Sequence, residues 1–286
     1  MTQPMIYLDT ALTSIVYLSA CFVLFGVGKL LYGVVHRQVQ VKHELVEKDN
    51  FAFAVAHVGY FIGLILAISG ALIGPTQGLV PDLIDIGIYG GLAIVLLNLS
   101  VIVNDKVMFR KFSVYREITE DRNVGTGAIE GANAVGTGLI IMGAISGQGG
   151  GVLTALVFWL VGQVLLVITA YIYAALVPYD VHDQIEHDNV AVGLGFAGAL
   201  ISIANLIRFG LMGDFYSWAD SLTEVGVDVA IGLLFLPLVR WLTDKILLPG
   251  QKLTDELVNQ EKPNIGAGLI EAFAYVGGSV LITLCL

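Results

Sequence analysis

Two glutamates inside long apolar segments are the residues of this sequence best suited to chemistry. Glu130 lies in residues 123–138, N-V-G-T-G-A-I-E-G-A-N-A-V-G-T-G, and Glu271 lies in a second copy at residues 264–278. An ionised carboxylate in hydrocarbon needs a partner or water, and otherwise it stays protonated. Such a group can relay protons or bind a small cation, or it can serve only as a hydrogen-bond donor between helices. Both interpretations remain open from the residues alone.

A histidine and an asparagine could complete a site with these carboxyls. Four helices are expected to begin at an asparagine, and the seventh residue after each asparagine lies about 10 Å along its helix. If these four helices surround a common axis, two carboxylates and the imidazole of His57 meet in one layer. Asn133, one turn from Glu130, is placed to orient it, whereas His57 could also be a hydrogen-bonded packing residue. The asparagines are Asn50, Asn123, Asn189 and Asn264, and the layer residues are His57, Glu130, Phe196 and Glu271.

The composition is that of a polytopic membrane protein. The chain is 56 % apolar and 13 % charged, with a mean hydropathy of +0.82. A helix needs roughly 20 apolar residues to cross the bilayer core, and the alternation typical of barrel strands is absent from these segments. The sequence therefore predicts an all-α membrane protein. Eight transmembrane helices are expected, at about residues 11–35, 51–74, 86–104, 123–146, 151–177, 190–213, 222–243 and 264–286.

The positive charges mark one side of the membrane. Thirteen of the 14 Lys and Arg residues lie in or beside three loops, within residues 29–48, 106–122 and 240–262. Basic loops stay in the cytoplasm, so both termini are expected outside. Residues 1–10 lack the basic region of a secretory signal, so the first apolar segment is expected to be an uncleaved span. Asp228 and Arg240 lie near enough to predicted helix ends to reach the interface.

The second half of the chain repeats the first. Residues 43–50 return as residues 182–189, and Asp105-Lys106 returns as Asp244-Lys245 at the same offset of 139. We predict two repeats, residues 1–147 and 150–286, with four spans each. An even number of spans preserves orientation, so the repeats are parallel. Each repeat is expected to divide into two hairpins, which gives four hairpins in a roughly fourfold layout with the Gly-rich, even-numbered helices inside.

The residues give no support to an enzyme active site or a cofactor. The sequence has no Walker A, HExxH or CxxC motif, and Cys21 and Cys285 lie in apolar segments, where packing is the expected role. His182 and His187 lie beside aspartates, but no metal is expected there, because the start of a helix explains the cluster. The basic loops also contain acids, which suits lipid headgroups or a protein partner better than nucleic acid.

The N-[VI]-G-x-G-x-I-E helices that begin at Asn123 and Asn264, in tandem four-span halves, resemble the bacterial YjfL-like membrane proteins. These proteins form a domain of unknown function, family 350, and the resemblance covers nearly the whole chain. It implies a location in the bacterial inner membrane and no established activity. The family is also found beside envelope-stress and membrane-scaffold proteins, which keeps a structural role open.

Two hypotheses about function follow. The first is a channel or transporter for protons or small cations that uses Glu130 and Glu271, helped by His57 and Asn133. The second is a non-transporting scaffold or envelope-stress component in the bilayer that recruits cytoplasmic or peripheral membrane proteins through its basic loops. Transport requires carboxyls that face a hydrated cavity, whereas a scaffold requires only their burial. A homo-oligomer is also expected, because the glycines of residues 87–91 would allow close contact between copies.

Overall fold

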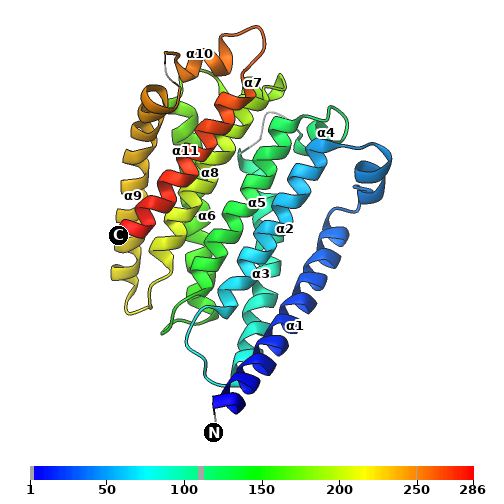
Figure 1. The fold of residues 1–286 in the computed structure, drawn as a ribbon, viewed down its shortest axis with the longest axis vertical. Coiled ribbons are helices and arrows are strands. Elements are labelled where there is room, and N and C mark those ends of the chain that lie inside the picture. Colours follow the sequence, from blue (N-terminus) through cyan, green and yellow to red (C-terminus); the bar gives the residue numbers. More distant parts are fainter. Residues whose placement is uncertain (1–2, 109–112, 249) are drawn as a thin grey trace.

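The computed structural model describes residues 3–108, 113–248 and 250–286, and every regular element in these ranges is a helix (Figure 1). Arg110 and Lys111, from the second basic loop, lie outside the described residues. Eight helices are long and apolar enough to cross a membrane, as predicted. They are α1 (Gln3–Val35), α2 (Phe51–Ser69), α3 (Leu79–Met108), α5 (Val124–Ile145), α6 (Val152–Leu176), α8 (Val190–Leu211), α9 (Trp218–Leu242) and α11 (Ile265–Cys285).

Short helical segments precede four of these helices at one end of the bundle, which we call the Asn-cap end. The segments are η1 (His43–Glu47), α4 (Val114–Thr119), α7 (Val181–Glu186) and α10 (Leu253–Val258), and they lead into α2, α5, α8 and α11. Two further short segments, η2 (Gly70–Leu72) and η3 (Thr243–Leu247), extend α2 and α9. Each repeat of the chain thus contains two copies of one unit, a short segment followed by a long helix.

An asparagine begins each of the four long helices that follow a short segment. The side-chain oxygen of Asn50 accepts the backbone N–H of Phe53 at 3.0 Å, which satisfies an amide that the first turn leaves free. Asn123, Asn189 and Asn264 make the same bond to the third residue on, at 2.9, 3.1 and 3.2 Å. Asp49, Arg122 and Asp188, directly before three of these asparagines, have positive φ angles of 51°, 57° and 57°.

The four Asn-capped helices form a row, in the order α2, α5, α8, α11. Glycines let neighbouring backbones touch: a Cβ added to Gly59 would lie 2.2 Å from Gly131 Cα, and one added to Gly193 would lie 2.5 Å from Gly125 Cα. Because α2 and α11 stand at opposite ends of this row, the predicted fourfold layout around a common axis is wrong. The four units, each a short segment followed by a long helix, lie side by side in a row that does not close around an axis.

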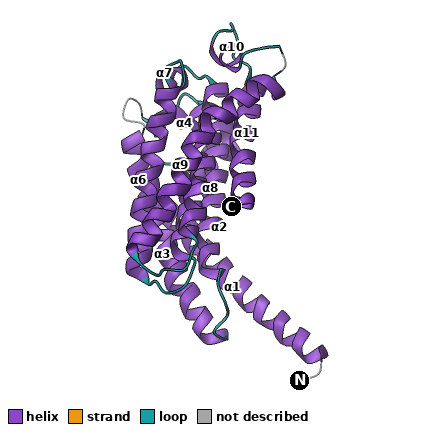
Figure 2. Ribbon diagram, turned by 90° about the vertical axis from the view of Figure 1, so that its left-hand side faces the viewer, coloured by secondary structure: helices purple, strands orange, loops and turns teal. Residues whose placement is uncertain are grey.

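Three of the other long helices, α3, α6 and α9, form a second layer on one face of the row (Figure 2). α3 covers α2 and α5, α6 covers α5 and α8, and α9 covers α8 and α11, while α1 leans mainly on α3. Gly90 of α3 packs against Leu24 of α1, so this glycine serves a contact within the chain. Polar side chains on the covered face of α5 or α11 therefore point between the two layers.

Candidate functional site

Glu130 lies on the face of α5 that points toward α3 and α6. Asn133 and Thr137 follow it at helical spacing on the same face. The carboxyl of Asp105, in the last turn of α3, lies beside the carboxyl of Glu130, close enough for the two to share a hydrogen bond. Two carboxyls can bond in this way only if a proton lies between them. No Lys or Arg in the described ranges forms an ion pair with either of them.

Side-chain amides continue this site deeper into the bundle. Asn133 donates to Asp105 at 3.4 Å and accepts from Asn104 at 2.8 Å. Asn104 also donates to Gln163 of α6 at 2.9 Å, and the Thr137 hydroxyl donates to the same Gln163 oxygen at 3.4 Å. We call the full set the carboxyl–amide cluster: Asp105, Glu130, Asn133, Asn104, Gln163 and Thr137.

The carboxyl–amide cluster leaves two buried polar atoms without a partner among the described residues, Oε2 of Glu130 and Nε2 of Gln163. A buried polar group without a hydrogen bond costs roughly 1–3 kcal/mol. Such a group is also free to bind a proton, a water molecule or a small cation. The cluster therefore has unused binding capacity at both its carboxyl end and its amide end.

His57 lies in an aromatic group beside this cluster. Its ring stacks on Phe53 at 5.1 Å and meets the edges of Tyr32 at 4.9 Å and Phe61 at 4.7 Å. Tyr32 in turn interacts electrostatically with Glu130. The structure thus places His57 among aromatic side chains, one of which, Tyr32, also lies near Glu130.

Glu271 belongs to a second, separate site. Its carboxylate is fully buried and forms an ion pair with the Arg240 guanidinium of α9. The Tyr275 hydroxyl donates to the same carboxylate at 3.3 Å, and Arg240 also donates to the Thr254 hydroxyl at 3.2 Å. The Tyr179 ring lies 5.8 Å from the guanidinium carbon. We call this set the ion-pair site.

The environment of the ion-pair site keeps its tyrosines neutral. Burial raises the pKa of Tyr179, in the loop after α6, to about 12, so its hydroxyl stays protonated at physiological pH. Gly195 of α8 provides the space for Glu271, because a Cβ there would lie 2.2 Å from Oε2 of Glu271. Helix α8 stands between α5 and α11, and the two carboxyl sites share no residue. The single layer predicted for His57, Glu130 and Glu271 does not form.

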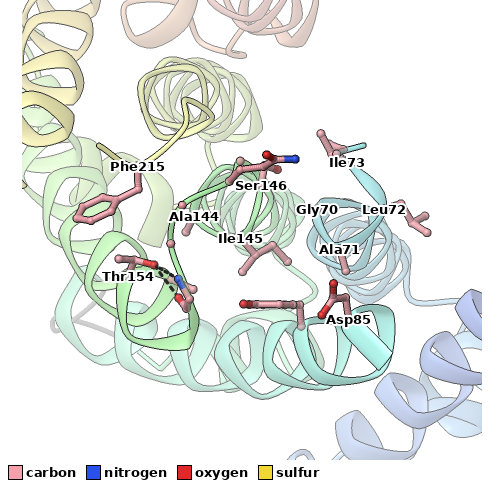
Figure 3. Close-up of a pocket in the computed structure, with 18 of the residues that line it drawn as sticks. Gly70, Ala71, Leu72, Ile73, Asp85, Ala144, Ile145, Ser146, Thr154 and Phe215 are labelled. Atoms are coloured by element: carbon pink, nitrogen blue, oxygen red, sulfur yellow. Dashed lines mark hydrogen bonds between the residues drawn. The ribbon is translucent and has the colours of Figure 1, made fainter. Parts of the chain in front are cut away.

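A pocket of about 620 Å³ lies at the end of the bundle opposite the Asn caps (Figure 3). The ends of α3, α5 and α6 and the loops beside them form its wall. Its lining includes Asp82 and Asp85 but no Lys or Arg. Asp82 accepts hydrogen bonds from Tyr17 and Thr76, both at 2.5 Å. The pocket is therefore polar and negatively charged, a surrounding that favours cations over anions.

An apolar layer separates this pocket from the carboxyl–amide cluster. Ile140 of α5 is fully buried, and its side chain packs directly on Gly162 of α6. Phe158, one to two turns before Gln163 on α6, is 5 % exposed and lines the floor of the pocket. Both polar regions thus lie between α3, α5 and α6, with tightly packed side chains between them.

Comparison with known proteins agrees with this architecture of two halves. A family described as Domain of Unknown Function (DUF350) matches residues 5–145 and again residues 149–286. The chain belongs to the DUF350 family. It is also 21 % identical over 182 residues to a UPF0719 transmembrane protein of Aquifex aeolicus (strain VF5), covering 63 % of this chain and 65 % of that relative. No solved structure matches the chain.

Sequence reasoning missed two important residues of this DUF350 protein. Asp105 fell outside the predicted span, residues 86–104, but α3 continues to Met108 and carries it to Glu130. The recurrence of Asp105 as Asp244, at the offset that relates the two repeats, was the sequence feature that could have indicated its importance. Arg240 was expected at the interface, yet it points inward to Glu271, because a buried carboxylate attracts it more than the interface does. Asp228 was also expected at an interface, and it is 7 % exposed against Gly210 of α8.

Proposed function

We propose that this DUF350 protein moves protons or a small cation across the bacterial inner membrane, with Glu130 and Asp105 as the exchange site. The observation that carries the proposal is the close approach of the Asp105 and Glu130 carboxyls, which have no cationic partner among the described residues. Two carboxyls in contact cannot both ionise easily, so the pair holds a proton or a cation. In an apolar bundle, a site of this kind typically marks an ion pathway.

The arrangement of polar groups supports a route along α3, α5 and α6. The carboxyl pair lies near the Asn-cap end, which the basic loops assign to the cytoplasm. The amides of Asn133, Asn104 and Gln163 extend from it, and the acidic pocket opens at the other end. Ile140 and Phe158 close the space between them. Transport then requires a shift of α6 against α5, which separates these two side chains and admits water or the ion.

The function proposed is non-enzymatic. The carboxyl–amide cluster offers acids and amides, and a protein that only passes ions needs no nucleophile. The alternative, a scaffold, draws support from the Arg240–Glu271 pair, in which the glutamate equivalent to Glu130 is held by a cation between two helices. In a scaffold, Glu130 and Asp105 would hold α3 and α5 together and conduct nothing.

Flux measurements on purified protein in liposomes test the proposal. Vesicles with a pH-sensitive dye inside are given a proton, Na⁺ or K⁺ gradient, and the initial rate is compared for wild type, Glu130→Gln and Asp105→Asn. Glu120→Gln is the matched control, because Glu120 is an exposed carboxylate of the Asn-cap end, with 63 % of its side chain accessible. We expect flux in the wild type and control and its loss in both site variants.

Gel filtration verifies that each variant is folded. No flux from well-folded wild type under any of these gradients contradicts transport and leaves the scaffold. Equal flux from wild type and both site variants shows that ions move elsewhere in the bundle.

A further inference from the structure

The two ends of the helix row are exposed where the interior of the row is buried. On α5, the side facing α8 contains Ile129, 1 % exposed, and Ile140, fully buried. The offset of 141 residues that relates Glu130 to Glu271 assigns Ile270 and Leu281 of α11 to the same positions. Ile270 is partly exposed and Leu281 is 65 % exposed. One side of α11 thus repeats a helix-packing face that has no helix on it.

Glycines on this side of α11 repeat the close contact as well. A Cβ on Gly125 of α5 would lie 3.3 Å from the Asn189 carbonyl oxygen and 3.4 Å from Val190 Cα, both across the interface with α8. Its counterpart Gly266 would meet only the side chain of its own cap residue, Asn264. Gly277, the counterpart of Gly136, would likewise meet only a ring of its own helix.

The opposite end of the row carries the complementary face. The side of α8 that packs on α5 includes Ala204, which is fully buried, and Leu211, which is 2 % exposed. The offset of 139 residues makes Ile65 of α2 and Leu72 of η2, which extends α2, their counterparts. These two are 56 % and 44 % exposed. The free side of α2 therefore matches the surface that receives α5, and the free side of α11 matches the surface that α5 presents.

The cap asparagines make a contact that repeats from unit to unit, and the last asparagine lacks it. Each side-chain amide donates to an acid or amide of its own short segment, and the first three also donate to a backbone carbonyl of the next segment along the row. Asn50 reaches Ile118 at 2.8 Å, Asn123 reaches Ile185 at 2.6 Å, and Asn189 reaches Leu257 at 2.9 Å. Asn264 donates to Glu256 at 2.7 Å, and no further segment follows it in the row. Each accepting carbonyl belongs to the residue directly after the acid or amide that bonds the cap asparagine of its own segment, so the equivalent position in a next unit is Leu45, which follows Glu44.

The first helix, α1, also lacks a contact that its counterpart α6 makes. α6 bridges the two repeats by packing on α3 and α5 of the first and α8 of the second. Its counterpart α1 has no preceding repeat to bridge. In the most apolar window of α1, 6 % of residues are buried, against 33 % in α6.

We propose that copies of this chain assemble head to tail, with α11 of one copy packed on α2 of the next as α5 packs on α8. The amide of Asn264 then donates to the Leu45 carbonyl of the neighbour, and α1 of that neighbour bridges the two copies as α6 bridges the two repeats. A second copy is the occupant that fits, because the interface continues one already present in the chain. Such an interface is heterologous, so it closes into a ring or extends as a row.

Disulfide cross-linking between single-cysteine proteins tests this arrangement. In a background with Cys21→Ala and Cys285→Ala, Ala54→Cys and Gly266→Cys occupy the positions that correspond to Gly193 and Gly125, whose backbones touch. The two proteins carry different tags, are co-expressed and are oxidised in membranes. We expect the mixed disulfide to exceed either like-with-like disulfide at least tenfold, because α2 of one copy meets α11 of the next copy and never a second α2.

Ile265→Cys is the matched control for Gly266→Cys, because it is 53 % exposed on the same helix and, as the adjacent residue, points about 100° away from Gly266. It should give at least tenfold less mixed disulfide with Ala54→Cys. A second pair, Ile65→Cys with Gly277→Cys, repeats the test at the positions of Ala204 and Gly136. Absence of the mixed product from both pairs, equal cross-linking of Ile265→Cys, or dominant like-with-like products overturns the proposal and leaves lipid or a symmetric contact on these faces.

Discussion

The equivalent glutamates of the two repeats, Glu130 and Glu271, have different partners. In the second repeat, Glu271 is paired with Arg240, and the offset of 139 residues places Val101 opposite that arginine in the first repeat. Val101 is 2 % exposed and brings no charge to Glu130. Glu130 lies instead beside a second carboxyl, that of Asp105. The difference between Arg240 and Val101 therefore separates a carboxylate held by a cation from a carboxyl that has another acid as its neighbour.

The residues around the two glutamates differ as well. Asn133, which ties Asp105 to Asn104, corresponds to Ala274 in the second repeat. Asp244, the counterpart of Asp105, accepts the backbone N–H of Leu253 and so serves the start of α10. The second repeat thus uses Arg240 and Asp244 to hold helices and segments together, whereas in the first repeat the equivalent positions bring no cation to Glu130 and place the acid, Asp105, beside it. After a duplication, one copy can keep the fold while the other is free to acquire or keep a transport site.

The largest effect is expected from removal of the cation in the second repeat. Arg240→Met should lower the free energy of unfolding by about 3–5 kcal/mol, because it leaves the fully buried Glu271 carboxylate unpaired. Thermal unfolding in detergent measures the change. Arg240→Met combined with Glu271→Gln should recover most of the stability, since both charges are then gone. A double variant as unstable as the single one would show that the arginine acts through packing and not through charge.

Transfer of the cation to the first repeat sharpens the comparison. In Val101→Arg, the guanidinium can pair with Glu130, so the carboxylate stays ionised and the shared proton is lost. On the proposed function, proton or cation flux should fall by about tenfold or more, and Val101→Met controls for side-chain size. Val101→Arg should also be more stable than Val101→Arg with Glu130→Gln. The reverse order of stability would mean that the new arginine does not reach Glu130.

The helices were predictable from the sequence, and their neighbours were not. Uncharged runs of about 20 residues and the asparagine before them are local features, so the eight spans and the starts of α2, α5, α8 and α11 follow from them. Which helices touch depends on how one hairpin is rotated against the next. A repeat that closes around an axis and one that extends in a row have the same sequence pattern, and this is why the fourfold layout was wrong.

The candidate site was predictable in part for a similar reason. Glu130 and Asn133 are one turn apart on one helix, so their proximity follows from local geometry. Asp105 and Gln163 reach them from other helices, and no spacing along the chain indicates such a contact. The repeat itself gave the missing hint, because Asp105 recurs as Asp244 at the offset that relates the two halves.

A smaller effect is expected when the amide network of the first repeat is made like the second. Asn133→Ala, which copies Ala274, removes the acceptor of Asn104 and a donor to Asp105. It should cost about 1–3 kcal/mol of unfolding free energy, because those buried groups lose a partner. The reverse change, Ala274→Asn, lacks a matching acid and should bring no gain. Chemical denaturation of both variants measures the difference, and equal losses would break the distinction between the repeats.

The smallest effect is expected in the short segments, where the repeats also differ. Asn123 donates to Glu117, whereas Asn189 donates to Gln184 at 2.8 Å, so an amide can replace the acid. Burial raises the pKa of Glu117, so its contribution to stability is present below about pH 4 and is lost as the pH rises through the raised value.

Glu117→Gln should therefore change the free energy of unfolding by less than about 0.5 kcal/mol at pH 8. At pH 4 the variant should be less stable, relative to the wild type, than it is at pH 8. Melting temperatures of the two proteins at both pH values measure this. A large loss at pH 8 would show that the ionised Glu117 stabilises its asparagine better than Gln184 does. The two repeats would then differ in their caps as much as in their carboxyl sites.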